Sequence, residues 1–218
     1  LLMACVSAGI PYLDITRWTS LQRRAAMRAA AAGPAAPVLL ASAWMAGVTP
    51  LVACHLAGRL DAVEEIDISI LYALADRAGA DSVEYVDRMT VPFETSVGGA
   101  PVTVRPLTSG RTVAFRGGAR ARVYRLDTPE QATLPLFTGA ATVSTRIGYD
   151  STLATFSLQA MRRSGVLRVL AHPRLTRLRR SLLHADGAGG TTRLAIWVSG
   201  AGSSVRGDLS DARGQAHL

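Results

Sequence analysis

Polar residues and a glycine follow two short apolar runs near the start of the chain, where they can do chemistry on a ligand. Asp14 and Thr16 end the first run, and Trp44 and Gly47 follow the second. Ligands of open parallel sheets bind beyond the carboxyl ends of the strands, so these four residues are the candidate binding residues. Gly47 precedes a predicted helix, whose free N–H groups can hold a carboxylate or an amide.

Each of these residues also has a purely structural interpretation. Asp14 can cap the turn that follows its strand, and Trp44 can belong to the core. His55 lies four residues after Leu51 and has no paired carboxylate, so we expect a core histidine rather than a catalytic acid. The sequence identifies no catalytic acid or base.

The elements that must position these residues alternate between helix and strand. Gly9 closes a first helix, and residues 11–16 and 38–43 form apolar strands on either side of a helix over Ser20–Ala32. A helix over Pro50–Leu60 follows. This alternation is typical of a parallel α/β sheet, so residues 1–60 are predicted to be the tail of a Rossmann-type cofactor domain.

Residues 61–218 are predicted to form an α+β domain with a mostly antiparallel mixed sheet, because their strands follow one another through short glycine turns. A helix is expected over Ser151–Arg163, capped by Asp150 or Ser151. The last expected strand covers Thr191–Ser199. The glycines after it do not follow the G-x-G-x-x-G spacing, which favours a β-turn over a dinucleotide site. The other strands are expected at residues 63–74, 102–107, 111–116, 120–126 and 141–147.

Three stretches resemble the saccharopine dehydrogenase-like family of NAD(P)-dependent oxidoreductases. Residues 4–14 read Ala-Cys-Val-Ser-Ala-Gly-Ile-Pro-Tyr-Leu-Asp, similar to the family's passage from helix to strand. Residues 38–50 resemble the strand, glycine turn and helix that leave its cofactor domain, although the family's Pro-Gly is replaced here. Residues 63–150 resemble its run of strands, with Asp127-Thr128-Pro129-Glu130 as a turn before another strand.

This resemblance implies hydride transfer between NAD or NADP and an imine or carbonyl group of a small-molecule substrate. It implies that the strand end at Asp14 faces the nicotinamide, that Trp44 can wall the ring, and that the second domain shapes the substrate pocket and a homodimer contact. The phosphate-binding half of the cofactor domain is expected upstream of Leu1. We therefore expect the chain to be a fragment that is inactive alone and does not bind NAD(P) measurably.

Charge is unevenly distributed along this chain of net charge +8. All 24 basic residues are arginine, which excludes Schiff-base chemistry on lysine within it. Residues 61–94 hold nine acids and two arginines, whereas from Arg162 to Arg180 there are seven arginines and no acid. A basic helix is expected to start in this segment at His172-Pro173 and to stop near Gly187. An alternative function follows, a non-catalytic interaction domain that binds an anionic partner through this helix. No aromatic residue interleaves with the arginines, so no nucleic-acid partner is expected.

The arginines of the basic helix can also be a solvent-exposed face with no binding role. In that case the helix buries an apolar stripe on its other side, formed by leucines at helical spacing that include Leu175 and Leu178. The two cysteines, Cys5 and Cys54, are interpreted as buried thiols of a cytoplasmic protein. No apolar run reaches the roughly 18 residues of a spanning helix, so no transmembrane segment is expected. The scattered histidines and cysteines provide no metal site.

Overall fold

A computed structural model describes residues 1–14, 19–40, 47–76, 88–178 and 189–212. Its helices are α1 (Leu2–Ser7), α2 (Thr19–Ala32), α3 (Val48–Ala57), α5 (Glu130–Thr138), α6 (Thr152–Arg163), α7 (Val166–Leu170) and the 3-10 helix η2 (Pro173–Leu175). Its strands are β1 (Tyr12–Asp14), β2 (Val38–Leu40), β3 (Glu65–Tyr72), β4 (Phe93–Val97), β5 (Ala100–Val104), β6 (Arg111–Ala114), β7 (Arg120–Arg125), β8 (Thr142–Tyr149), β9 (Thr192–Gly200) and β10 (Ser203–Asp211).

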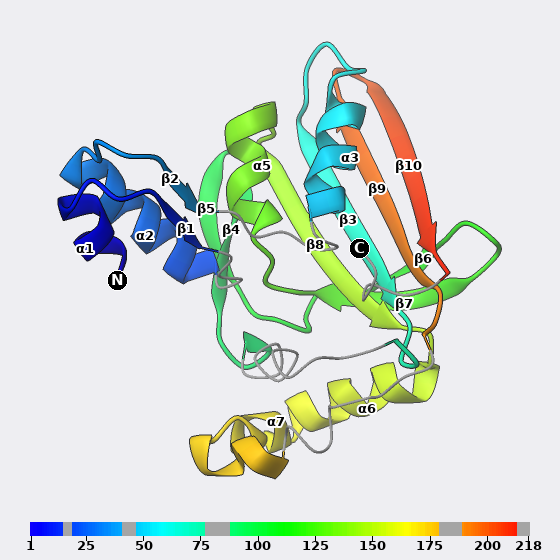
Figure 1. Cartoon of the computed structure of the whole chain (residues 1–218). Helices are drawn as coiled ribbons and strands as arrows, with labels where there is room; N and C mark the ends of the chain where they lie inside the picture. The colour runs from blue at the N-terminus through cyan, green and yellow to red at the C-terminus, as the bar shows by residue number, and fades with distance from the viewer. Residues whose placement is uncertain (15–18, 41–46, 77–87, 179–188, 213–218) are drawn as a thin grey trace.

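The centre of the molecule is a mixed sheet of six strands in the order β10-β9-β3-β8-β7-β6 (Figure 1). β3 and β8 run parallel, and the other neighbouring pairs of this sheet are antiparallel. The α/β class and the mixed sheet are therefore as the sequence predicts. Two smaller sheets, the parallel pair β1–β2 and the hairpin β4–β5, complete the described strands.

One face of the six-stranded sheet packs against helices and forms the main core. Ile66, Ile68 and Ile70 alternate along β3 and are fully buried on this face. Helices α3 and α5 cover the same face in Figure 1, with Leu56 and Leu134 in the shared cluster. Although α3 lies before residue 60, its buried side belongs to this core.

The opposite face of the sheet is curled around a second, smaller cluster. Leu71, Val113 and Phe115 are buried there against residues of β7 and β9. The curl brings the two edge strands together, since Arg206 of β10 donates to the carbonyl oxygen of Ala114 in β6 at 2.6 Å. The sheet thus comes close to closing on itself.

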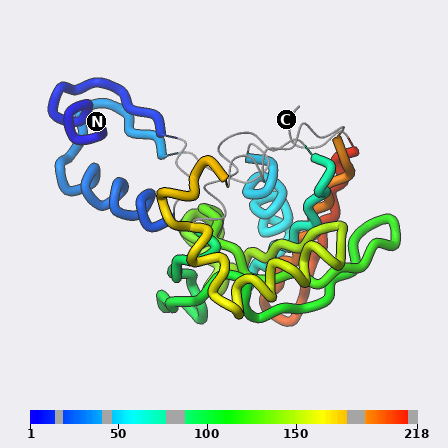
Figure 2. The backbone as a smooth tube through the Cα atoms, turned by 90° about the horizontal axis from the view of Figure 1, so that it is seen from below, coloured from blue at the N-terminus to red at the C-terminus, as the bar shows by residue number. Residues whose placement is uncertain are grey.

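Residues 1–14 and 19–40 lie to one side of this body (Figure 2). β1 and β2 pair in parallel, with Tyr12 opposite Val38 and Asp14 opposite Leu40. Helix α2, which connects them, packs on β2, and Gln22 donates to the Leu40 carbonyl at 3.1 Å. The predicted helix and strand alternation is therefore present here as a single parallel pair.

The structure corrects three sequence-based assignments. Asp127-Thr128-Pro129-Glu130 leads into helix α5 rather than a strand, and Leu134 of α5 is completely buried in the core. Strand β4 was not expected, and β10 follows the strand expected to be the last. The turn between β9 and β10 is as predicted, because Ala201 and Gly202 have the positive φ values of a two-residue hairpin turn.

Candidate functional site

The carboxyl ends of β1 and β2 lie at the same edge of their sheet, and this edge is the first candidate site. Asp14 lies opposite Leu40 at this edge and is half-buried. The Tyr12 hydroxyl donates to Asp14 Oδ2 at 3.0 Å, and this bond is the main cause that raises the pKa of Tyr12. Asp14 is therefore positioned by its own strand. Thr16 lies outside the described residues, so its placement remains a prediction.

Gly47 lies immediately before α3 with φ 95° and ψ −5°, in the left-handed region. A Cβ atom at this position would meet no atom within 4 Å. Glycine is thus required by backbone conformation, while the space beside it is open. No side chain caps α3, and Pro50 in its first turn carries no N–H. Trp44 lies outside the described residues.

A buried polar contact that the sequence does not predict joins this edge to the second region. Thr19, the first residue of α2, donates its hydroxyl proton to Asp127 Oδ1 in the segment before α5. Burial raises the pKa of Asp127, and the Thr19 hydrogen bond and the charge of Arg88 oppose that shift. Nearby on the surface, Arg23 pairs with Glu94 at 2.7 Å. Both contacts fix α2 against elements more than 70 residues away.

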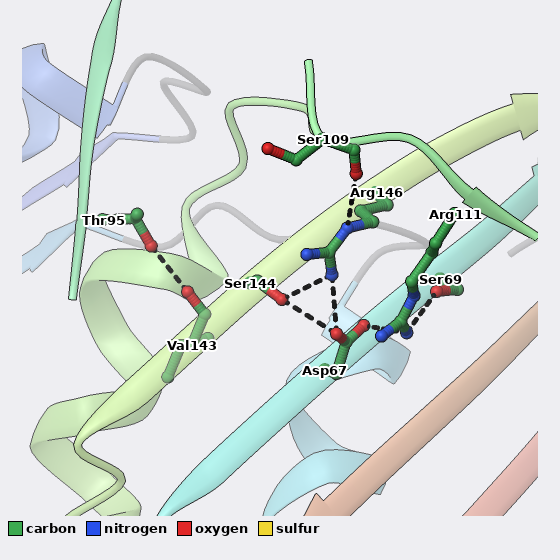
Figure 3. A network of polar contacts seen from close by, with 8 residues as sticks. All are labelled: Asp67, Ser69, Thr95, Ser109, Arg111, Val143, Ser144 and Arg146. Carbon is green, nitrogen blue, oxygen red and sulfur yellow. Dashed lines mark hydrogen bonds and ion pairs between the residues drawn. The ribbon is translucent and has the colours of Figure 1, made fainter. Parts of the chain in front are cut away.

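A charge network crosses the curled face of the six-stranded sheet (Figure 3). We term it the arginine network, and it comprises Asp67, Ser69, Arg111, Ser144 and Arg146. Asp67 lies between the two arginines, with Oδ1 at 2.5 Å from Arg111 Nη2 and Oδ2 at 2.6 Å from Arg146 Nη1. Ser144 donates to the same carboxylate at 3.1 Å.

The elements that hold this network explain its geometry. Asp67 and Ser144 are register partners on β3 and β8, so their side chains share one face. Arg111 reaches the same carboxylate from edge strand β6, and its guanidinium carbon lies 5.6 Å from the centre of the Trp197 ring. Because both oxygens of Asp67 are engaged, the carboxylate joins the curled strands rather than serving as a free base.

Positive charge exceeds negative charge beside this network. Arg125 is the register partner of Arg146, and its main chain is bonded to Leu107 and Thr108 in the adjoining loop. Burial is the main cause that lowers the pKa of Arg125, and the charge of Arg146 adds to it. The adjoining loop holds Leu107 and Ser109 at φ 56° and 49°, a backbone strain of about 1–3 kcal/mol each.

A further expectation is wrong. His55 is exposed and contacts Arg59 at 3.0 Å, since Ala53, Leu56 and Ala57 form the buried side of α3. The helix boundaries of the basic stretch are as predicted: α6 ends at Arg163, and a new helical segment starts at Pro173, after the N-cap His172. The short helix α7, which lies between them, was not expected.

The described residues of the leucine stripe are Leu175 and Leu178. Leu178 is 46% exposed rather than buried, whereas Arg174 and Arg177 are exposed as expected. The remainder of the stripe lies outside the described residues. Within the described residues, Leu175 is half-buried and Leu178 is exposed, so this part of the stripe is less buried than the spacing predicts.

Comparison of the chain with protein-family models and with curated proteins gives no match. Among the described residues, no group of three or more histidine, cysteine or acidic side chains is arranged to hold a metal ion. The described helices include none that is long and apolar enough to cross a membrane. Cys5 and Cys54 are both free and half-buried.

Proposed function

We propose that residues 1–60 supply the carboxyl edge of a Rossmann-type sheet in an NAD(P)-dependent oxidoreductase similar to the saccharopine dehydrogenase-like enzymes. The observation that carries the proposal is the parallel β1–α2–β2 unit with aligned carboxyl ends. This edge leads toward a left-handed glycine and an uncapped helix N-terminus. Such an edge is where open α/β sheets bind their ligands.

The exposed apolar face of the β1–β2 pair supports the same proposal. Leu13 and Leu39 are register partners and are 63% and 54% exposed on one face. Parallel sheets occur almost only with both faces covered, and two strands alone bury too little to be stable. The proposal accordingly requires further strands, together with a glycine-rich phosphate-binding turn, from chain outside the 218 residues.

The described residues fit the nicotinamide half of such a cofactor. The open space at Gly47 admits a ligand beside the backbone at the start of α3. Asp14 is held by Tyr12 and can orient a donor at the same edge. The bound nucleotide supplies hydride exchange with an imine or carbonyl group. The six-stranded sheet shapes the pocket for a small-molecule substrate and provides a homodimer contact.

The test is NADPH binding by the protein encoded by the entire reading frame that contains this chain. We expect saturable binding, measured by the fluorescence of the reduced nicotinamide. The Gly47→Val variant should bind more weakly. The isolated 218 residues should not bind measurably, because they lack the turn that holds the pyrophosphate. A folded whole protein that binds neither NADPH nor NADH overturns the proposal.

A further inference from the structure

A pocket of about 380 Å³ opens at the far end of the six-stranded sheet, where β7, the end of β8 and helix α6 meet. Its volume is within the usual range for small-molecule sites. Figure 1 shows α6 below the sheet and the β1–β2 pair to its left, so this pocket is separate from the proposed cofactor edge. The inference therefore does not rest on the proposed function.

The walls of the pocket combine positive charge with apolar surface. Arg120, Arg122 and Arg193 line it, against a single carboxylate from Asp150. Asp150 is already engaged, because its Oδ1 accepts the Leu74 N–H at 3.1 Å. The Arg122 guanidinium carbon lies 5.8 Å from the centre of the Tyr124 ring, which keeps that charge at the aromatic wall.

Aromatic side chains and a hydroxyl complete the lining. Phe156, on α6, leaves 68% of its surface exposed at this pocket. Burial raises the pKa of Tyr149 to about 12, so its phenol stays protonated at neutral pH. Tyr149 lines the pocket, so its neutral phenol can act as a hydrogen-bond donor there.

The start of α6 adds to the positive potential. Thr152, its first residue, lines the pocket, and the helix is 12 residues long. Ser151 caps only the N–H of Ala154, at 3.2 Å. The positive end of this helix and the three arginines therefore act on the same space.

We propose that this pocket binds a small planar organic anion, an aromatic ring that bears a carboxylate. The ring packs against Phe156, and the carboxylate accepts charge-assisted hydrogen bonds from Arg122. Arg120 and Arg193 add positive charge to the same pocket. Tyr149 donates a further hydrogen bond. The arginines select for negative charge, and the small lining residues Ala119 and Ala121 leave room for a flat ring.

The probe for this proposal is 4-fluorobenzoate, observed by ¹⁹F NMR, with 4-fluorobenzyl alcohol as its uncharged counterpart. For so small a ligand we expect a dissociation constant on the order of 1 mM for the benzoate. The alcohol should bind at least about tenfold more weakly, because it cannot form the charge-assisted bonds. Equal binding of the two probes overturns the proposal, and so does the absence of saturable benzoate binding.

Two variant pairs locate the site. Arg122→Gln should weaken benzoate binding about tenfold, while Arg116→Gln, exposed in the same β6–β7 hairpin, should leave it unchanged. Phe156→Ala should weaken it severalfold, while Leu153→Ala on the same helix should not. All four side chains are exposed, so the variants should keep the thermal midpoint of the parent. Equal effects within either pair overturn the assignment of the site.

Discussion

The two sheets that contain a parallel strand pair differ in how much of their apolar surface is buried. The six-stranded sheet buries an apolar cluster on each face, and a hydrogen bond from Arg206 links its edge strands. The β1–β2 pair leaves Leu13 and Leu39 exposed on one face. Within the described residues, the large sheet therefore has both faces covered, whereas one face of the small pair is left open.

The largest effect should come from removing the shared carboxylate of the arginine network. Asp67→Ala leaves the Arg146 side chain, only 11% exposed, without its carboxylate partner on a buried face. We expect a loss of about 3–5 kcal/mol in the free energy of unfolding, measured with urea. The matched control is Asp208→Ala in the more exposed Arg206 pair, where about 0–1 kcal/mol is expected. Similar losses in the two variants would contradict a structural role for the network.

A direct comparison of the two sheets uses the same type of truncation in each. Ile68→Ala removes a fully buried side chain from the core face of β3 and should cost about 2–5 kcal/mol. Leu39→Ala removes a side chain that is 54% exposed, so this chain should lose less than about 1 kcal/mol. Thermal unfolding of both variants measures this. A large loss for Leu39→Ala would mean that the β1–β2 face is already covered.

Gly47 lies where the two regions meet, and its substitution should have an intermediate effect. Valine tolerates the φ of 95° poorly, so Gly47→Val should cost about 1–3 kcal/mol. Gly58→Val at the other end of α3 is the control, since Gly58 has φ −65° and ordinary contacts. Chemical denaturation of both variants separates backbone strain from loss of space. An equal loss at both glycines would exclude the strain explanation.

The smallest expected effect concerns the contact between α2 and the segment before α5. Burial raises the pKa of Asp127, so the folded state holds the proton more tightly and the ionised carboxylate lowers stability as the pH rises. Asp127→Asn keeps an oxygen acceptor for Thr19 and removes the charge. It should stabilise the chain slightly at pH 7, with a smaller gain near pH 4. A loss at pH 7 would show that the attraction between Asp127 and Arg88 outweighs desolvation.

Local signals predicted the elements whose causes lie within a few residues. Ser151 caps α6 as expected, and Ala201-Gly202 forms the expected hairpin turn. Strand β4 escaped prediction because its polar residues bond to β8 about 45 residues away, as Thr95 does with the Val143 carbonyl at 2.6 Å. Pro135 lies inside α5, which obscured its helical pattern.

The candidate sites also differ in whether their causes are local in the sequence or distant. Asp14 and Gly47 could be selected because strand ends and glycine turns are visible in sequence. The arginine network could not, since Arg111 and Arg146 are 44 and 79 residues from the aspartate that joins them. His55 was placed in the core because helical spacing does not show which side of α3 meets the sheet. Both the arginine network and the exposure of His55 depend on how distant segments pack together.

Hydrogen exchange of the protein from the entire reading frame, with and without NADPH, tests the central claim most directly. The account predicts that the nucleotide slows amide exchange in peptides that span 12–21 and 45–52, at the carboxyl edge of β1–β2 and the start of α3. Peptides of the β9–β10 hairpin, residues 192–211, should show no change. Slower exchange confined to that hairpin, or binding that leaves both N-terminal peptides unchanged, would contradict the assignment of this edge as the cofactor site.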